Sequence, residues 1–255
     1  MSAEELRFSK AEMAVVFQHV WAQPSVPNET MLVDLNLDEA ALSAGRRSLV
    51  DRGLLFADSR RSDSALSPSL EPTLSAVTHP EVLGVLEIGS PGNAPRSAYI
   101  SWTREMVVLN QVTQSGDHVL NPLPGVDAIG EAALQFSDLN RYKKAKAEPV
   151  PDPETIARRA TLRAVFMAVA DPAALQPATE AVAWLVSGDG IWLMEEGEGE
   201  TPRLMPASAA EVGRKVVSMM RAAIEGLGSG RSGAPVSKGN GGSGARTVRS
   251  RRDSK

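Results

Sequence analysis

The side chains that most often perform chemistry in proteins are few and widely spaced in this sequence. The three histidines are His19, His79 and His118, and none belongs to a His-x-x-x-His or Glu-x-x-His pair of the kind that binds a metal. Cysteine is absent, which excludes disulfides, thiolate ligands and cysteine nucleophiles. The sequence has neither a Gly-x-Ser-x-Gly nucleophile turn nor a Walker phosphate-binding loop. We therefore predict a protein that is not an enzyme and holds no metal and no cofactor.

An acidic stretch offers a different kind of site. From Glu195 to Glu200 glutamate largely alternates with glycine, which is typical of a solvated hairpin turn. A cation site would need oxygens that converge on one point, and this alternation gives no sign of that. An exposed acidic turn can instead contact a protein partner, so Glu196 and Glu198 are candidate partner-binding residues.

Large apolar residues gather on both sides of this turn. Adaptable methionines and tryptophans are common where proteins bind helical segments. The candidate partner-binding residues of this kind are Trp184, Trp192, Met194 and Met205. The alternative is that they belong to the core, because the side chains of a strand alternate and half of them must point inward.

Charge is distributed unevenly along the chain. The net charge is -4, and the segment from Gly228 to Lys255 holds seven basic residues and one acidic residue, which leaves +6 on this tail and -10 on the body. A body so acidic is a poor binder of phosphate backbones. Rich in Gly, Ser and Arg, the tail is predicted to be disordered. It either acts as a solubilising segment or touches nucleic acid or anionic lipid through Arg246, Arg249, Arg251 and Arg252.

The elements that would position these residues are mainly strands. Residues 96–120 read as a three-stranded antiparallel meander with tight turns, and residues 181–206 repeat that pattern. Both copies lead into a helical segment. The alignment places Trp102 opposite Trp184, Val107 and Val108 opposite Ile191 and Trp192, and Pro124 opposite Pro206. We expect an α+β fold in which two βββα-like halves form an antiparallel central sheet, flanked by helices, about a pseudo-twofold axis.

Helix signals fill the remaining chain. Ser9 with Glu12, and Ser208 with Glu211, have the spacing of capping boxes that open helices over residues 9–21 and 208–226. Further helices are expected over residues 37–55, after Ser67 and over residues 154–169, with short strands at 31–35 and 82–88 and a polar loop at 60–68. The predicted organisation is an N-terminal half at 1–140, a charged and proline-rich linker at 141–153, a C-terminal half at 154–227 and the tail at 228–255.

One helix admits a second function. The segment 37–55 ends in Arg-Gly-Leu, and Arg46 and Arg47 could face phosphates as in a winged-helix transcription regulator. The preceding helices are wrongly spaced for a compact helix-turn-helix, and the body is acidic. DNA binding through residues 37–55 is therefore the alternative function and not the leading one.

Three short motifs follow one another in the first half. They are Leu-x-Phe-Ser-x-x-Glu at 6–12, Leu-Val-Asp-Arg-Gly-Leu-Leu at 49–55 and His-Pro-Glu-Val at 79–82, just before the meander. In this order they resemble EspG-type proteins, the cytosolic chaperones of type VII (ESX) secretion in actinobacteria. The second half, up to about residue 226, is similar to that family in architecture only.

The resemblance implies a pseudo-twofold fold with a central antiparallel sheet, in agreement with the repeat. It also implies a non-enzymatic, protein-binding role: holding the hydrophobic tip of an amphipathic helical secretion substrate so that it stays soluble before export. A cytoplasmic location is expected, because the N-terminus is acidic and lacks an apolar core and no run of residues is long and apolar enough to cross a membrane.

Overall fold

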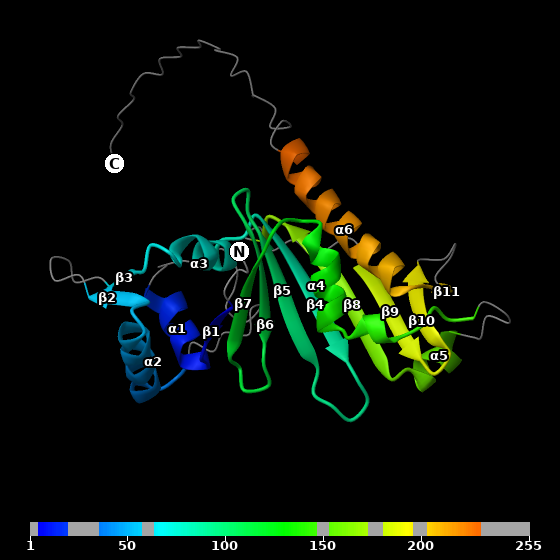
Figure 1. Ribbon diagram of the computed structural model, residues 1–255, viewed down its shortest axis with the longest axis horizontal. Coiled ribbons are helices and arrows are strands. Elements are labelled where there is room, and N and C mark those ends of the chain that lie inside the picture. The colour runs from blue at the N-terminus through cyan, green and yellow to red at the C-terminus, as the bar shows by residue number, and fades with distance from the viewer. Residues whose placement is uncertain are drawn as a thin grey trace, which may run out of the picture.

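A single antiparallel sheet organises the molecule. The computed structural model describes residues 5–19, 36–57, 64–146, 153–172, 181–195 and 203–230. Within these ranges nine strands pair in the order β1-β7-β6-β5-β4-β8-β9-β10-β11, and every pair is antiparallel (Figure 1). Helices cover both faces of the sheet. The predicted α+β class with a central antiparallel sheet is confirmed.

The first half of the sheet is a meander of four strands. They are β4 (Val82–Gly89), β5 (Arg96–Trp102), β6 (Val107–Val112) and β7 (His118–Leu123). The short β1 (Leu6–Phe8) pairs with residues 118–120 of β7. Pro122 pairs with Val108 of β6 and lies beyond the end of β1, so its missing N–H costs no hydrogen bond to β1.

The second half repeats this meander. Its strands are β8 (Leu162–Ala170), β9 (Ala181–Ser187), β10 (Gly190–Glu195) and β11 (Arg203–Pro206). The halves join where β4 and β8 pair along eight residues, from Val82 with Ala170 to Gly89 with Arg163. Each half thus completes the sheet of the other.

The helix predicted over residues 154–169 is wrong for most of its length. Only α5 (Pro153–Arg159) is helical, and β8 follows at once. Leu162, Ala164 and Phe166 are buried on one face while Arg163 is exposed, which is the two-residue period of a strand. Apolar residues stand on the other face as well, and this hid the alternation in the sequence.

The pairing register confirms the repeat and corrects its alignment. The pairs Trp102–Val107 and Val108–Pro122 correspond to Val186–Ile191 and Trp192–Pro206, so each number rises by 84. Val107 and Val108 are therefore equivalent to Ile191 and Trp192, as predicted. Trp102, by contrast, is equivalent to Val186 and not to Trp184, and the equivalent of Pro206 is Pro122 and not Pro124.

Two helices cover one face of the sheet. They are α4 (Ala128–Phe136), which follows β7, and α6 (Ala209–Gly230), which follows β11, and in Figure 1 both cross in front of the strands. The largest core lies beneath them and includes Ile100, Ile129, Phe166, Trp184 and Val216. Because α4 and α6 occupy equivalent places in the two meanders, the pseudo-twofold relation extends to this layer.

The opposite face carries a different cover over each half. Over the first half lie α1 (Lys10–His19), α2 (Glu39–Asp51) and α3 (Glu71–Thr78), with a core that includes Phe17, Leu49 and Leu83. Over the second half a smaller cluster of six residues forms around Trp192 and Ile156 of α5. The three N-terminal helices gather at the β7 end of the sheet in Figure 1.

Local signals explain where several elements begin. At α1 the Ser9 N–H donates to Glu12 Oε2 (2.7 Å) and Glu12 N–H donates to Ser9 Oγ (3.2 Å), and Ser208 with Glu211 makes the same exchange at α6. The helix predicted over 37–55 is shorter, because it begins after Asp38, whose side chain caps it by accepting from the Ala41 N–H at 2.7 Å. Gly53 ends it with φ of 66°, as expected of a helix-terminating glycine.

Other predictions need adjustment or lie outside the description. The predicted polar loop at 60–68 includes β3 (Ser64–Leu66), which pairs with β2 (Leu55–Ala57), and α3 begins at Glu71 rather than at Ser67. α6 continues to Gly230, four residues past the predicted stop. The strand predicted at 31–35, residues 147–152 of the predicted linker and the tail from residue 231 lie outside the described residues.

Candidate protein-binding surface

The two tryptophans predicted to contact a partner are part of the core. Trp184 and Trp192 are both 0% exposed and lie on opposite faces of the sheet. Trp184 packs under α6. Trp192 packs on the α5 side, where its Nε1 donates to Ser187 Oγ at 3.2 Å. Neither side chain is accessible to another protein in this structure.

The two methionines occupy different environments. Met205 on the edge strand β11 is 48% exposed and points to the α6 side of the sheet, together with its pairing partner Leu193. Met194 is partly buried and packs against the cluster around Trp192 on the other side. The remaining predicted contacts, Glu196 and Glu198 with Arg246, Arg249, Arg251 and Arg252, lie outside the described residues.

Met205 lines a depression between α6 and the edge of the sheet. Two adjoining hollows of about 340 and about 470 Å³ form it, and they share Leu193, Glu195, Lys215 and Ser218. We call this depression the sheet-edge trough. The hollow beside Met205 is mainly apolar and is completed by Pro206 and Ala207. The other hollow exposes more polar than apolar surface and adds Ala181, Val182, Met194, Met219 and Ala222. On α6 it extends from Glu211 to Ala222, which is roughly 17 Å of helix.

Ion pairs hold the walls of the trough in place. Lys215 Nζ lies 3.2 Å from Glu195 Oε1 and so ties α6 to β10. Lys144 Nζ lies 3.2 Å from Glu211 Oε2 and ties the chain after α4 to the start of α6. Hydrogen bonds from the Ser208 backbone and side chain, with a contribution from Lys144, lower the pKa of Glu211 to about 2. Glu211 is therefore ionised at neutral pH, and both Glu195 and Glu211 are already paired.

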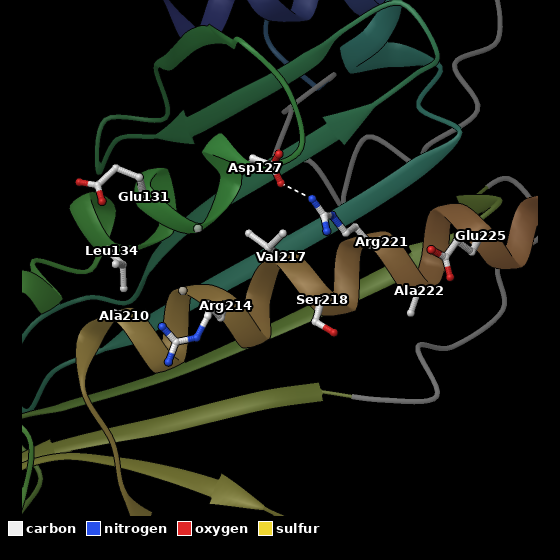
Figure 2. A pocket seen from close by; sticks show the side chains of 12 residues that line it. Asp127, Glu131, Leu134, Ala210, Arg214, Val217, Ser218, Arg221, Ala222 and Glu225 are labelled. Carbon is white, nitrogen blue, oxygen red and sulfur yellow. Dashed lines mark hydrogen bonds and ion pairs between the residues drawn. The ribbon is translucent and has the colours of Figure 1, made fainter.

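A second groove runs between α4 and α6. It encloses about 760 Å³ and its lining is mixed, with Asp127, Glu131 and Arg221 beside Leu134 and Val217. Figure 2 shows Arg221 reaching across to Asp127, with which it forms an ion pair. The helices cross closely here, because a Cβ on Gly130 would stand 2.9 Å from the Gly213 carbonyl oxygen. The groove is thus bridged at one point by the Asp127–Arg221 ion pair, and charged side chains stand beside its apolar ones.

Two buried polar groups described in the first half have shifted pKa values. His118 is buried and its Nδ1 lies 3.1 Å from Asn110 Oδ1. Burial lowers the pKa of His118 to about 4, although nearby Asp117 opposes the shift. Burial also raises the pKa of Tyr99 to about 12, with Glu87 adding to the rise. Both groups are therefore uncharged at neutral pH.

Two general features bear on function. In the described ranges no three His, Cys, Asp or Glu side chains stand close enough to bind a metal ion together. The helices of the described chain are also too short or too polar to cross a membrane.

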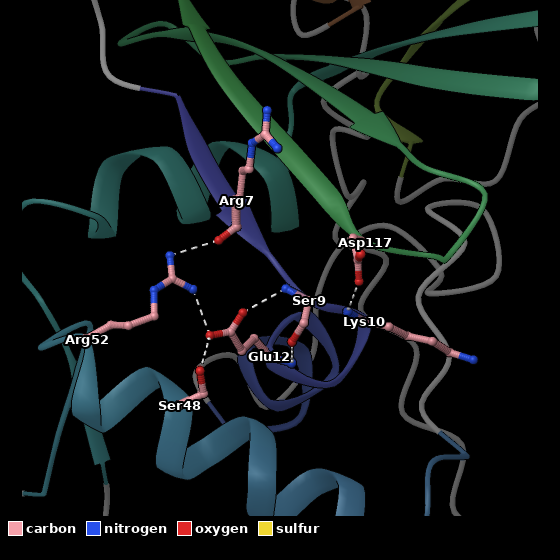
Figure 3. Close-up of polar contacts among 7 residues, drawn as sticks. All are labelled: Arg7, Ser9, Lys10, Glu12, Ser48, Arg52 and Asp117. Carbon is pink, nitrogen blue, oxygen red and sulfur yellow. Dashed lines mark hydrogen bonds and ion pairs between the residues drawn. The ribbon is translucent and has the colours of Figure 1, made fainter.

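The predicted DNA-binding helix is tied into the fold by a charge network (Figure 3). The buried carboxylate of Glu12 accepts hydrogen bonds from Arg52 Nη1 at 2.7 Å and Ser48 Oγ at 2.9 Å. Arg52 also donates to the Arg7 carbonyl at 2.8 Å and lies over the Phe8 ring. The Arg-Gly-Leu step after α2 therefore has a structural role, joining α1, α2 and β1.

Sequence reasoning missed the α6 side of the trough. Arg214, Ser218 and Ala222 are exposed and four residues apart, so they form one stripe along α6. That spacing was visible in the sequence. What the sequence could not show is that the stripe borders an edge strand with an exposed methionine.

Comparison with known proteins gives a fold and no sequence relationship. No protein-family model matches the chain, and no curated protein matches it. Among solved structures the chain is similar to the Mycobacterium tuberculosis type VII secretion system chaperone EspG5, solved in complex with a PE25–PPE41 dimer. The TM-score is 0.60 at 9% identity, and the match covers 86% of this chain and 96% of EspG5. The two proteins share a fold across nearly their whole lengths.

Proposed function

We propose that this protein is a non-enzymatic, cytosolic chaperone that binds a helical secretion substrate and keeps it soluble. The observation that carries the proposal is the match over nearly the full length to EspG5, a chaperone solved with a protein dimer bound. The likeness at 9% identity supports a chaperone-like fold, and the helical partner and the secretion role are our extension of it.

The surface of the molecule is compatible with this role. Its most exposed large apolar side chains in the described ranges are Val50, Phe56 and Met205, and the last of these lines the mainly apolar hollow of the trough. The described polar groups with shifted pKa values are buried or held in structural ion pairs, as with Glu12 and Glu211. Binding without chemical conversion fits such a surface better than catalysis does.

The DNA-binding alternative is not supported. The chain is similar to a chaperone and Arg52 is used internally. An acidic body also repels phosphate backbones.

The direct test is complex formation with the PE25–PPE41 dimer. The purified chain and the dimer, mixed at equal concentration, are expected to co-elute from a size-exclusion column and to remain together in high salt, because apolar burial resists screening. Elution of the two components at their separate volumes in both low and high salt would refute the proposal. A DNA duplex replaces the dimer as the negative control.

A further inference from the structure

At its Met205 end, the sheet-edge trough combines an exposed apolar side chain with an apolar floor. Met205 is half exposed, although most large apolar side chains of the described chain are buried or partly buried. Leu193, Pro206, Ala207 and Met219 continue the apolar surface around it. Covering such a surface with a Leu or Met side chain removes apolar area from water and so favours binding.

The charges around the trough are paired with one exception. Glu195 binds Lys215, and Glu211 binds Lys144. Arg214 is exposed and, in the described part of the chain, makes no hydrogen bond or ion pair. Arg214 borders both the trough and the groove shared with α4, and Figure 2 shows its side chain projecting from α6. The trough therefore presents one unneutralised cation beside its apolar floor.

The shape of the edge favours a helix over an added strand. Within the described residues β11 spans four residues, and its last residue, Pro206, has no N–H to donate to a neighbouring strand. The α6 wall of the trough is about three helical turns long, which suits an amphipathic helix laid alongside it.

From these observations we infer that the sheet-edge trough binds an amphipathic helix of the protein partner, with a large apolar side chain against Met205 and Leu193 and a carboxylate on Arg214. The inference rests on the proposed function, since it names the surface and the chemistry of the same partner. An arginine pairs with a carboxylate through two parallel N–H donors, which gives the site a preference for acidic helices over basic ones.

The test uses two labelled helical peptides of about 16 residues, a length at which an isolated helix begins to form. Both carry leucines along one face, and one has glutamates where the other has lysines beside that face. Fluorescence anisotropy is expected to show the glutamate peptide binding at least about tenfold more tightly, equivalent to about 1.4 kcal/mol. Equal affinity for the two peptides, or no binding by either at about 1 mM, would overturn the inference.

Two variants locate the binding. Arg214→Glu should reverse the preference between the peptides, and Met205→Asp should weaken the glutamate peptide about tenfold. The matched controls are Arg158→Glu on α5 and Phe56→Asp on β2, which also alter exposed side chains and should leave both affinities unchanged. If a control variant changes binding as much as its counterpart in the trough, the site is not the trough.

The same variants separate this inference from the proposed function. If the chain still co-elutes with the PE25–PPE41 dimer when Met205→Asp and Arg214→Glu are combined, the chaperone role stands and the trough is not its binding surface. If the dimer never binds but the peptides show the predicted preference and its reversal, the trough is a helix-binding site and the proposed function is wrong.

Discussion

Glu12 is a buried carboxylate on which three elements converge. Its contacts predict how much this one residue contributes to stability. Burial by itself would raise its pKa, but hydrogen bonds from Ser9, Arg52 and Ser48 hold the pKa below the usual value. Glu12→Gln should lower the free energy of unfolding by about 2 kcal/mol, because the charge-assisted bond to Arg52 is lost inside a closed packing. Urea denaturation measures this change.

The matched control is the exposed pair between Arg7 and Glu5, for which Glu5→Gln should change stability by no more than about 0.5 kcal/mol. The pH dependence follows from the direction of the shift. Because the folded pKa of Glu12 is lowered, its stabilising contribution is complete above pH 4.5 and is lost as pH falls through the folded value. Equal losses in Glu12→Gln and Glu5→Gln would contradict the structural role of Glu12.

His118 makes a separate prediction in a higher pH window. Its pKa is about 4 in the folded chain and 6.5 in the unfolded chain, so the unfolded chain binds the proton first. Stability should therefore fall by about 3 kcal/mol as pH decreases from 6.5 to 4. His118→Gln should abolish most of this slope and His79→Gln should retain it, as measured by urea denaturation at several pH values. An unchanged slope in His118→Gln would show that another group causes it.

Individual residues also show how far sequence reasoning reaches. Ser9 with Glu12 and Ser208 with Glu211 were predictable, because a capping box is local and satisfies its own backbone donors. The burial of Trp184 and Trp192 was not predictable, because alternation shows that a strand has two faces but not that both faces are covered. That Arg214 is the unpaired charge of the trough, among the residues described, could be recognised only from the ion pairs of its neighbours, which the sequence does not show.

At the scale of elements, the crossing of α4 and α6 depends on small residues. A Cβ at Gly130 would meet the Gly213 carbonyl oxygen at 2.9 Å. At Gly213 the nearest atom would belong to the movable Leu134 side chain, at 3.3 Å, and the Gly130 carbonyl oxygen would stand at an ordinary contact distance of 3.6 Å. Alanine favours a helix over glycine by about 1 kcal/mol at either position. We expect Gly213→Ala to be close to neutral and Gly130→Ala to destabilise by about 1–3 kcal/mol, because backbone must move.

Thermal denaturation of the two variants checks this difference. The comparison is internally controlled, since both substitutions add the same methyl group to the same helix pair. Equal midpoints for the two variants would contradict the close crossing.

The segments that flank β4 and β8 explain why β4 was predicted from the sequence and β8 was not. β4 is followed at once by a loop rich in proline and glycine, which marks its end. β8 follows α5 after two residues and has apolar residues on both faces, since it lies beside the central strand β4 and is covered on both faces. A continuous apolar run of that kind fits a buried helix equally well, and only the pairing with β4 decides.

For the whole molecule, we predict that both halves unfold together, because the pairing of β4 with β8 joins them in one sheet. Gly84 lies at this junction, where a Cβ would stand 2.8 Å from the Phe166 ring and 3.1 Å from Met220. Gly84→Val should lower the free energy of unfolding by about 2–4 kcal/mol, and the unfolding midpoint should fall with it. The midpoint should fall by the same amount whether it is followed by tryptophan fluorescence or by far-ultraviolet circular dichroism. The fluorescence is dominated by the buried Trp184 and Trp192. Separate transitions for the two signals would mean that the halves are independent.

The proposed function assigns to the continuous, pseudo-twofold sheet the holding of a helical protein that it does not alter. Light scattering of PPE41 during dilution from denaturant tests this claim most directly. With an equimolar amount of this chain present, scattering should be largely suppressed, and mass spectrometry should find the mass of PPE41 unaltered. Scattering as strong as without the chain, or a PPE41 of changed mass, would contradict it.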